Sequence, residues 1–406
     1  MKDLELSYSI LKEIYVNKAY AALELSNKIK DAENPKFVTN LVYGVLEKDT
    51  QFNYYIDTLV SKKPKNAIII LLKIGMYLVK YMNSMPTYAA VSNTVSLCDS
   101  VGKREVKGFV NATLKKFSTI EFEMPKDKFL ALSIESSTPL FIVKKLCNQY
   151  GYEKAKEFLM LPNFELEHVR VNSRKSTMKE IEDKIKDFVP STNNSIYAKN
   201  DKVVKDLYAC GKITIQSLSS MKACEVLAPN DGDKILDLCS APGGKSIYMS
   251  ELANVDIVSC DIHEHRLDLI KSYINRMGAQ GISIKLNDAT ILNEEFVDKF
   301  DKVLADVPCS GLGVANRKPD IYLNISDKDI KDLSEIQYKI LCNAAKYVKK
   351  GGVLVYSTCT ILREENQNNV KKFLKDNKDY KSVEEIQLLP NKEGLDGFYI
   401  HKMTRV

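Results

Sequence analysis

Apolar residues recur at helical spacing throughout residues 1–118. In the stretch "YSILKEIYVNKAYAALEL", Ile10, Leu11 and Ile14 fall on one face of a predicted helix. The segments "NPKFVTNLVYGVLEKD", "FNYYIDTLVS" and "TYAAVSNTVSLCDSV" keep the same period. Three prolines stand at or between segment ends, where helices start or stop: Pro35, Pro64 and Pro86. The pattern predicts a small all-α bundle.

The most apolar stretch of the chain, "NAIIILLKIGMYLVKYM", covers residues 66–82. It contains Lys73 and Lys80 and is too short to cross a bilayer, so we expect a buried core helix and no membrane span. The first residues, "MKDLELSYSI", lack the basic and then apolar pattern of a signal peptide.

Further along the chain the period changes. More helix is predicted over 126–165, and Val169 and Val171 then alternate with polar residues before the helical stretch "TMKEIEDKIKDF". We therefore predict a helical linker and a small α+β subdomain of the RRM or ferredoxin-like type over 126–210, after a first domain over 1–125.

Short aliphatic runs alternate with helix-length segments over residues 211–406. The runs are "DKILDLC", "VDIVSCD", "ISIKLND", "DKVLADV" and "GGVLVYST". Such alternation is typical of a parallel, doubly wound α/β sheet, so the third domain is predicted to be Rossmann-like. Length alone already favours two or three domains.

Charge and cysteine usage narrow the class of protein. Lys and Arg exceed Asp and Glu by six, which suits a polyanionic partner without requiring one. The nine cysteines form no C-x-x-C pair and only four histidines are present, so we expect no structural metal. Scattered free thiols are typical of a reducing cytoplasm, and we expect a monomer there.

The first strand of the predicted sheet runs into "LDLCSAPGGKS". A phosphate loop would need a glycine where Cys239 stands, and the dinucleotide pattern G-x-G-x-x-G is absent. A loop for S-adenosylmethionine needs only small residues that let the backbone approach the ligand. This loop supplies Ser240, Ala241, Pro242, Gly243 and Gly244.

Acidic residues close the next two strands. Asp261 stands about twenty residues after the glycines, where a carboxylate can accept both hydroxyls of an unphosphorylated ribose. Asp288 closes the third strand and could reach the adenine edge. A single such Asp is often only a helix cap, but three strand ends in order favour an S-adenosylmethionine site.

Two cysteines follow the last two strands of the series. Asp306 and Cys309 follow the fourth strand, and Cys359 follows the fifth, so both thiols should project toward the crevice that holds the cofactor. Carbon 5 of a pyrimidine is a poor nucleophile until a thiolate adds at carbon 6, which makes carbon 5 electron-rich enough to accept a methyl group. A carboxyl at Asp306 could hydrogen-bond the base. The chemistry does not decide which thiol is the nucleophile.

The motifs "LDLCSAPGGKS", "DVPCSGLGVANRKPDI", "YSTCTILREENQ" and "DGFYIHKM" resemble those of the Sun family of RNA cytosine-5 methyltransferases. The helical N-terminal region is similar to the NusB-like RNA-binding domain of the RsmB branch. The resemblance implies methylation of one cytosine in 16S ribosomal RNA.

The resemblance also implies residue roles. Cys359 would be the nucleophile, and Cys309 would assist release of the methylated product. Asp306 would contact the base, Lys245 would close the cofactor loop, and Arg266 would lie at its edge. Cofactor contacts would come from these positions: Cys239, Ser240, Ala241, Pro242, Gly243, Gly244, Lys245, Asp261, Arg266, Asp288 and Asp306.

One motif departs from the family pattern. The branch usually has R-R-H-P-D where this chain has "NRKPD" at 316–320, but Arg317 and Lys318 keep two basic groups for RNA contact. The target base must leave its stack before a thiol can reach it, so we expect a looped or single-stranded target. The N-terminal bundle and the 165–210 subdomain would hold the surrounding backbone.

Two other functions compete with this one. An RNA-binding, antitermination-like protein that has lost activity is less favoured because the motif cysteines, Asp306 and "APGGK" are all present. An ATP-driven enzyme using "GGKS" is disfavoured by the missing first glycine of the phosphate loop.

Overall fold

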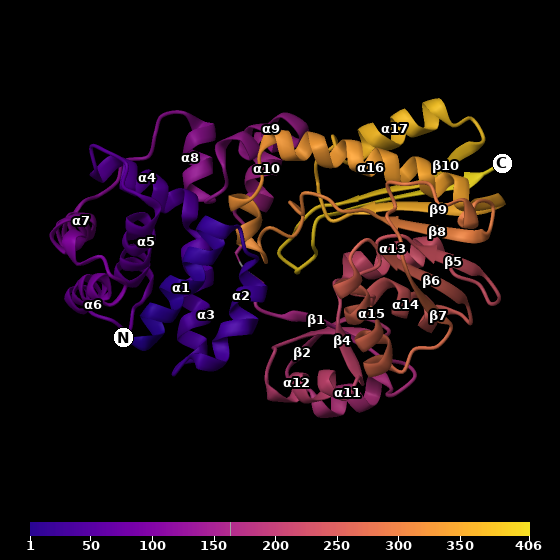
Figure 1. The fold of residues 1–406 in the computed structure, drawn as a ribbon, viewed down its shortest axis with the longest axis horizontal. Helices are drawn as coiled ribbons and strands as arrows, with labels where there is room; N and C mark the ends of the chain where they lie inside the picture. Colours follow the sequence, from indigo (N-terminus) through magenta and orange to yellow (C-terminus); the bar gives the residue numbers. More distant parts are fainter. Residues whose placement is uncertain (163) are drawn as a thin grey trace. The chain divides into compact units, whose positions relative to one another are not determined.

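A computed structural model describes residues 1–162 and 164–406, and the chain divides into two compact units. The helical unit comprises residues 1–160 together with 315–325. The sheet unit comprises residues 161–314 and 326–406 (Figure 1). The domain limits at 125 and 210 stay predictions, but the return of 315–325 to the first unit was not anticipated from the sequence.

The helical unit contains α-helices and short 3-10 helices, as the apolar period predicts. They are α1 (Lys2–Asn17), α2 (Ala21–Lys28), η1 (Ile29–Asp31), α3 (Pro35–Glu47), α4 (Asp49–Leu59), α5 (Asn66–Tyr81), α6 (Thr87–Ser100), η2 (Arg104–Val106), α7 (Lys107–Thr119), α8 (Lys128–Glu135), α9 (Leu140–Tyr150), α10 (Tyr152–Leu159) and η4 (Pro319–Leu323). Pro35 occupies the first turn of α3, where its missing N–H is not needed, and the Asn34 side chain caps that helix by accepting from Phe37 N at 3.0 Å.

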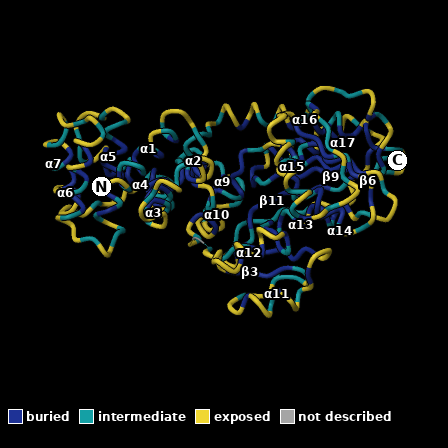
Figure 2. Tube along the Cα trace, turned by 60° about the horizontal axis from the view of Figure 1, so that its bottom comes forward, coloured by how far each residue is buried: buried dark blue, intermediate teal, exposed yellow. Residues whose placement is uncertain are grey.

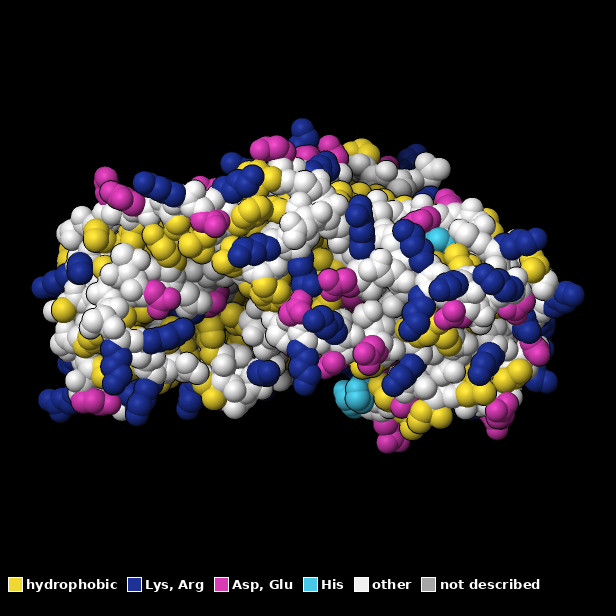
Figure 3. Space-filling view, turned by 90° about the horizontal axis from the view of Figure 1, so that it is seen from above, with side chains coloured by type: hydrophobic (Ala, Val, Ile, Leu, Met, Phe, Trp, Pro, Cys, Tyr) yellow, Lys and Arg dark blue, Asp and Glu magenta, His cyan; other side chains and the backbone are white. Residues whose placement is uncertain are grey.

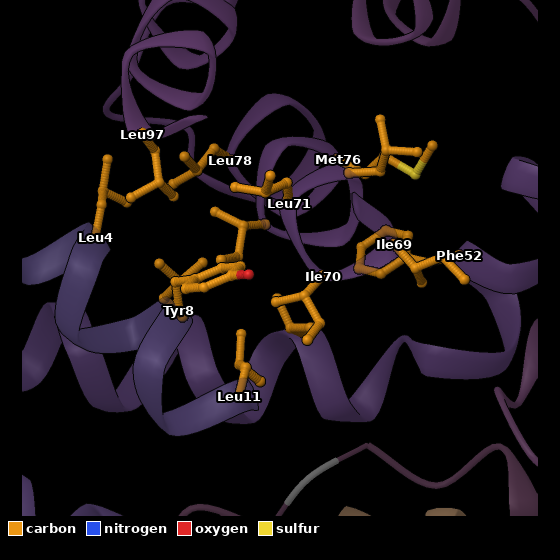
Figure 4. Close-up of a cluster of buried hydrophobic side chains, with 14 of the residues drawn as sticks. Leu4, Tyr8, Leu11, Phe52, Ile69, Ile70, Leu71, Met76, Leu78 and Leu97 are labelled. Carbon is orange, nitrogen blue, oxygen red and sulfur yellow. The ribbon is translucent and has the colours of Figure 1, made fainter. Parts of the chain in front are cut away.

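Helix α5 forms the centre of this unit. Ile70, Leu71 and Leu78 are buried and pack with Leu4 and Leu11 of α1 (Figure 4). This confirms the buried helix predicted over 66–82. Lys73, the charge inside that apolar stretch, is also buried and forms an ion pair with Asp49 of α4. In the described part of the chain, no helix is both long enough and apolar enough to cross a membrane.

The segment Ala315–Ile325 belongs to the helical unit although the chain on both sides of it belongs to the sheet unit. Asp320 is only 7% exposed, and its Oδ2 accepts a hydrogen bond from Ala21 N at 3.1 Å, at the start of α2. Tyr20, the N-cap residue, makes no side-chain cap bond. A carboxylate near the positive end of a helix is favourable, so Asp320 acts as the cap that α2 lacks. Leu323 packs against the same core as α5.

The sheet unit begins with a small antiparallel sheet. Its elements are β1 (Glu167–Val171), α11 (Met178–Lys184), β2 (Phe188–Thr192), β3 (Ser195–Ala198), α12 (Lys202–Ala209) and β4 (Ile213–Ile215). The chain order βαββαβ and the sheet order β2-β3-β1-β4 are those of a ferredoxin-like fold, as predicted. The run at 213–215, expected to open the third domain, instead pairs with β1.

The large sheet has seven strands in the order β10-β11-β9-β8-β5-β6-β7 (Figure 1). Its elements and covering helices are α13 (Leu218–Leu227), β5 (Lys234–Asp237), α14 (Gly244–Leu252), β6 (Asp256–Asp261), α15 (Glu264–Met277), β7 (Ile282–Leu286), η3 (Glu294–Phe296), β8 (Phe300–Asp306), α16 (Asp327–Tyr347), β9 (Val348–Thr358), α17 (Gln367–Asp376), β10 (Tyr380–Leu388) and β11 (Phe398–Arg405). The five predicted strands, β5 to β9, are parallel.

The sheet is mixed rather than wholly parallel, because β11 and β10 add to its edge in antiparallel pairing. Buried side chains of α16 and α17 form one core on the sheet, and those of α13 and α14 form another. Figure 2 shows the strands of this sheet, such as β9 and β6, buried between the helices. Helices on both faces are what a doubly wound fold requires.

Candidate functional site

The carboxyl ends of five parallel strands meet at one edge of the large sheet, which is where doubly wound folds bind ligands. Strand β5 ends at Asp237, β6 ends at Asp261 and β8 ends at Asp306. Cys309 follows β8, and Cys359 directly follows β9. Because β9, β8, β5 and β6 are neighbours in that order, the sheet brings the predicted thiols and the predicted cofactor loop to one edge.

The loop after β5 is held in a tight bend. Ser240 donates from both its backbone N and its Oγ to the carbonyl oxygen of Cys260, at 2.8 and 3.0 Å. Gly243 has a φ of 108°, a conformation that favours glycine, and it is the N-cap residue directly before α14. The thiol of Cys239 packs against the core, so this residue can offer a ligand only its backbone.

Asp237 is a candidate that the sequence analysis did not single out. It is fully buried at the end of β5 and its Oδ2 accepts from Ser246 Oγ at 2.6 Å, while no polar atom of the described residues pairs with Oδ1. Burial raises the pKa of Asp237 to about 7, despite the Ser246 hydrogen bond and the charge of Lys245. A buried acceptor without a partner beside a glycine loop fits a ligand that carries a hydrogen-bond donor or a cation. The sequence feature that could have identified Asp237 is an acidic residue within the apolar run "KILDL".

The two acids at the next strand ends are partly engaged in local bonds. Oδ1 of Asp261 accepts from His263 N at 3.1 Å and lies 4.0 Å from Nη1 of Arg266. Oδ1 of Asp288 accepts from the backbone N and from Oγ1 of Thr290, at 2.9 and 2.6 Å. In each case the hydrogen bonds found among the described residues use one carboxylate oxygen, which leaves the second for a ligand. Together with the glycine loop, this donor and acceptor set fits S-adenosylmethionine.

Lys245 and Asp306 form an ion pair at the same edge, with Nζ 2.6 Å from Oδ2. Burial lowers the pKa of Lys245, but the charge and hydrogen bond of Asp306 more than offset it and raise the pKa above its ordinary value. Oδ1 of Asp306 accepts from Ser357 Oγ at 2.7 Å. Lys245 therefore stays charged and, with Ser357, fixes the orientation of the carboxylate.

The two predicted thiols lie in contact. Sγ of Cys309 is 3.2 Å from Sγ of Cys359, and no disulfide joins the two. The hydrogen bond to Cys359, burial, and the negative charges of Cys359 and Glu365 together raise the pKa of Cys309 well above its usual value. Cys309 therefore stays a protonated thiol at neutral pH.

The loop that bears Cys309 is pinned to the strand that bears Cys359. Gly313 N donates to the carbonyl oxygen of Cys359 at 2.9 Å, and Gly397 N donates to the carbonyl oxygen of Gly313 at 2.8 Å. A Cβ on Gly313 would overlap the backbone of Gly397, so only glycine permits this approach. This explains the second glycine in "CSGLG".

Basic side chains are spread over the one face that Figure 3 shows. On the face shown in Figure 3, Lys and Arg alternate with Asp and Glu. Within the helical unit, a groove of about 850 Å³ lies between α6 and α7. It is lined by Tyr88, which is 77% exposed, and by Lys107, Asn111 and Lys115, among others. An exposed aromatic ring beside lysines and an amide offers stacking and phosphate contacts together.

Comparison with known proteins gives two family matches. Residues 224–404 match the family described as 16S rRNA methyltransferase RsmB/F, and residues 1–119 match the NusB family. A probable ribosomal RNA small subunit methyltransferase B of Bacillus subtilis is 32% identical, with 99% of this chain and 98% of the relative covered. Ribosomal RNA small subunit methyltransferase B of Salmonella paratyphi B is 30% identical, with 94% and 92% covered.

Solved structures share the fold. The crystal structure of PH0851 has a TM-score of 0.86 at 22% identity and covers 99% of this chain and 98% of its own. NSun6 from Pyrococcus horikoshii with SFG has a TM-score of 0.56 at 22% identity, covering 65% of this chain and 98% of its own. The full-length relatives and the two family matches agree with the fold: this chain belongs to the RsmB/F family of S-adenosylmethionine-dependent 16S rRNA methyltransferases and carries a NusB-like helical domain at its N-terminus.

Proposed function

We propose that this enzyme methylates carbon 5 of one cytosine in 16S ribosomal RNA through a transient cysteine–cytosine bond. The observation that carries the proposal is the pair of thiols 3.2 Å apart at the edge of the sheet where the cofactor loop also ends. Two sulfur atoms in contact can divide the work, because one can bond to the base while the other holds or moves a proton.

Cys359 is proposed as the nucleophile. Its thiolate adds to carbon 6 of cytosine, the electrons of the 5,6 double bond move to carbon 5, and carbon 5 takes the methyl group. S-adenosylmethionine, when bound, supplies that group as an electrophilic methyl on a sulfonium. The raised pKa of Cys309 supports this division, since the thiol that stays protonated is the poorer nucleophile.

Cys309 and Asp306 are proposed to act on protons. After methyl transfer, Cys309 gives its proton to the departing sulfur of Cys359 and, as a thiolate, takes the proton from carbon 5, so that the 5,6 double bond forms again as the bond from carbon 6 to sulfur breaks. Cys309 assists this release at its contact distance from Cys359. The Asp306 carboxylate, oriented by Lys245 and Ser357, would hydrogen-bond the exocyclic amine of the base.

Cofactor contacts are proposed for the loop from Cys239 to Lys245, for Asp261 and Asp288, and for Asp237, with Arg266 at the edge. RNA contacts are proposed for the α6–α7 groove and for the exposed Lys62, Lys63 and Lys65 between α4 and α5. Arg317 and Lys318 remain candidates, with Lys318 exposed. The enzyme is proposed to act as a monomer in the cytoplasm.

The test follows label from the methyl group of S-adenosylmethionine into 16S rRNA and then locates it by mapping methylated cytosines. Wild-type enzyme should label one cytosine, and replacement of Cys359 by Ala should abolish both labelling and any covalent RNA complex. Replacement of Cys309 by Ala should let the covalent complex accumulate as a slowly migrating band. A covalent band with the Cys359 variant but not with the Cys309 variant would mean that the roles are exchanged. Label on a base other than cytosine would refute the proposal.

A further inference from the structure

A buried carboxylate, that of Glu365, joins the loops that carry the two thiols. Glu365 follows β9 and is fully buried. Its Oε1 accepts from the backbone N of Ser310 at 2.8 Å, and its Oε2 accepts from Ser310 Oγ at 2.5 Å and from Thr360 Oγ1 at 3.0 Å. Ser310 is the residue after Cys309, and Thr360 is the residue after Cys359. One side chain therefore holds the neighbours of both sulfur atoms.

Further bonds extend this arrangement to the other side of each cysteine. Nε2 of Gln337, in α16, donates to Oε1 of Glu365 at 2.9 Å and to the carbonyl oxygen of Pro308 at 3.0 Å. Asn366 accepts from Thr358 Oγ1 at 2.6 Å and donates to the carbonyl oxygen of Thr360 at 3.0 Å. The backbone on both sides of each thiol is thus tied to a network that Glu365 connects.

A purely structural role would not require a charge at this position. The same four bonds can be made by a glutamine whose carbonyl oxygen faces Ser310 N and Gln337, while its amide faces the hydroxyls of Ser310 and Thr360, which can rotate to accept. A buried carboxylate is expensive to desolvate, so its presence suggests an electrostatic use. Its charge is one of the causes that raise the pKa of Cys309.

We propose that Glu365 is a positioning residue that fixes the contact between the two thiols and places a negative charge beside Cys309. This inference rests on the proposed function, since it assigns a reason for the division of roles between the sulfurs. Without the charge, Cys309 would lose its proton more readily and would have none to give to the departing sulfur of Cys359, the step that turns Cys309 into the base for the proton on carbon 5.

Two variants separate charge from geometry. Glu365→Gln keeps the bonding pattern and removes the charge, whereas Glu365→Asp keeps the charge and is one methylene too short to reach all four donors. Glu335→Gln on the exposed side of α16 is the matched control. Circular dichroism of each full-length variant verifies that it is folded.

The first readout does not use RNA. In a Cys359→Ser background, the rate of alkylation of Cys309 by iodoacetamide is followed against pH. Glu365→Gln should move the midpoint down by about one pH unit, because a nearby negative charge favours the protonated thiol, and Glu365→Asp should leave it nearly unchanged. An unchanged midpoint for Glu365→Gln would overturn the electrostatic part of the proposal even if the enzyme methylated no RNA at all.

The second readout uses 16S rRNA and otherwise wild-type cysteines. Measured above the alkylation midpoint of Cys309, Glu365→Gln should slow turnover by up to about tenfold, in step with the fraction of protonated Cys309, and should raise the level of covalent RNA complex; near pH 7 the change in turnover should be small. Glu365→Asp should slow turnover by up to about 100-fold through misplacement of the thiols. Glu335→Gln should behave as wild type. Wild-type turnover in both Glu365 variants would overturn the proposal, whereas absence of any covalent complex in wild type and in Cys309→Ala would count against the proposed function instead.

Discussion

Asp237 predicts an unusual dependence of stability on pH. Its carboxyl group is fully buried, one oxygen has no partner among the described residues, and its pKa is raised to about 7. In the unfolded chain an aspartate titrates near 3.8. The folded state therefore binds this proton more tightly, so the group stabilises the fold at low pH and that contribution is lost as pH rises from about 4 to about 7.

The size of the effect follows from the two pKa values. A difference of about three units corresponds to about 4 kcal/mol of stability that is present at low pH and absent above pH 7. Half of it, about 2 kcal/mol, should remain at about pH 5.5. Asp237→Asn places a neutral amide at the same position, so the variant should lack this pH dependence and should be more stable than wild type at about pH 8 in the absence of cofactor.

The assay is urea unfolding of the full chain and of Asp237→Asn at both pH values, followed by circular dichroism. When the unfolding free energies of the two proteins are subtracted, the contributions of all groups that titrate alike in both cancel. That difference should favour the variant by about 2 kcal/mol more at the higher pH than at the lower. Parallel pH profiles for the two proteins would refute the assignment of a raised pKa to this carboxyl group.

Substitutions at three further sites test separate parts of the structure. Asp320→Ala leaves Ala21 N buried without its acceptor and should cost about 1–3 kcal/mol of unfolding free energy, measured by calorimetry, while Asp320→Asn should cost less. Arg170→Ala leaves the buried carboxylate of Glu251 unpaired and should cost about 3–5 kcal/mol by urea unfolding, more than Glu251→Gln. Lys115→Gln in the α6–α7 groove should weaken RNA binding and lower the slope of log affinity against log salt by about one, and an unchanged slope would remove this groove from the RNA site.

Much of the sheet unit was predictable because its signals are local. The strand-end residues Asp261, Cys309 and Cys359 lie at the edge where the alternation of strands and helices placed them. The two sulfurs reach the same edge because β8 and β9 are parallel neighbours joined by a crossover through α16. The helical bundle of the first unit was equally predictable, because its apolar residues recur with a period of about 3.6 residues.

Other features depend on contacts between residues distant in sequence, which no local pattern records. The run at 213–215 has the pattern of a strand. Its sheet is set by the pairing of Ile215 with Val169, some 45 residues earlier, which no local pattern shows. The antiparallel edge of the large sheet also depends on a hairpin that returns beside β9. Glu365 stood within the quoted "LREENQ" motif, yet its role is visible only once Ser310 is seen against it. Asp320 stood in a motif expected to meet RNA and is instead buried against α2.

The return of residues 315–325 to the helical unit affects the order in which the protein can mature. During synthesis, residue 160 leaves the ribosome well before residue 325, and at about 5–20 residues per second the interval is roughly 10 to 30 s. Throughout that interval Ala21 N, in the first turn of α2, lacks its acceptor Asp320, and the part of the helical core that Leu323 will cover is exposed to solvent. The helical unit is therefore incomplete without residues 315–325. A fragment ending at residue 160 should be less stable than the same fragment with that segment present, and adding the peptide 315–325 in trans should restore part of the lost stability.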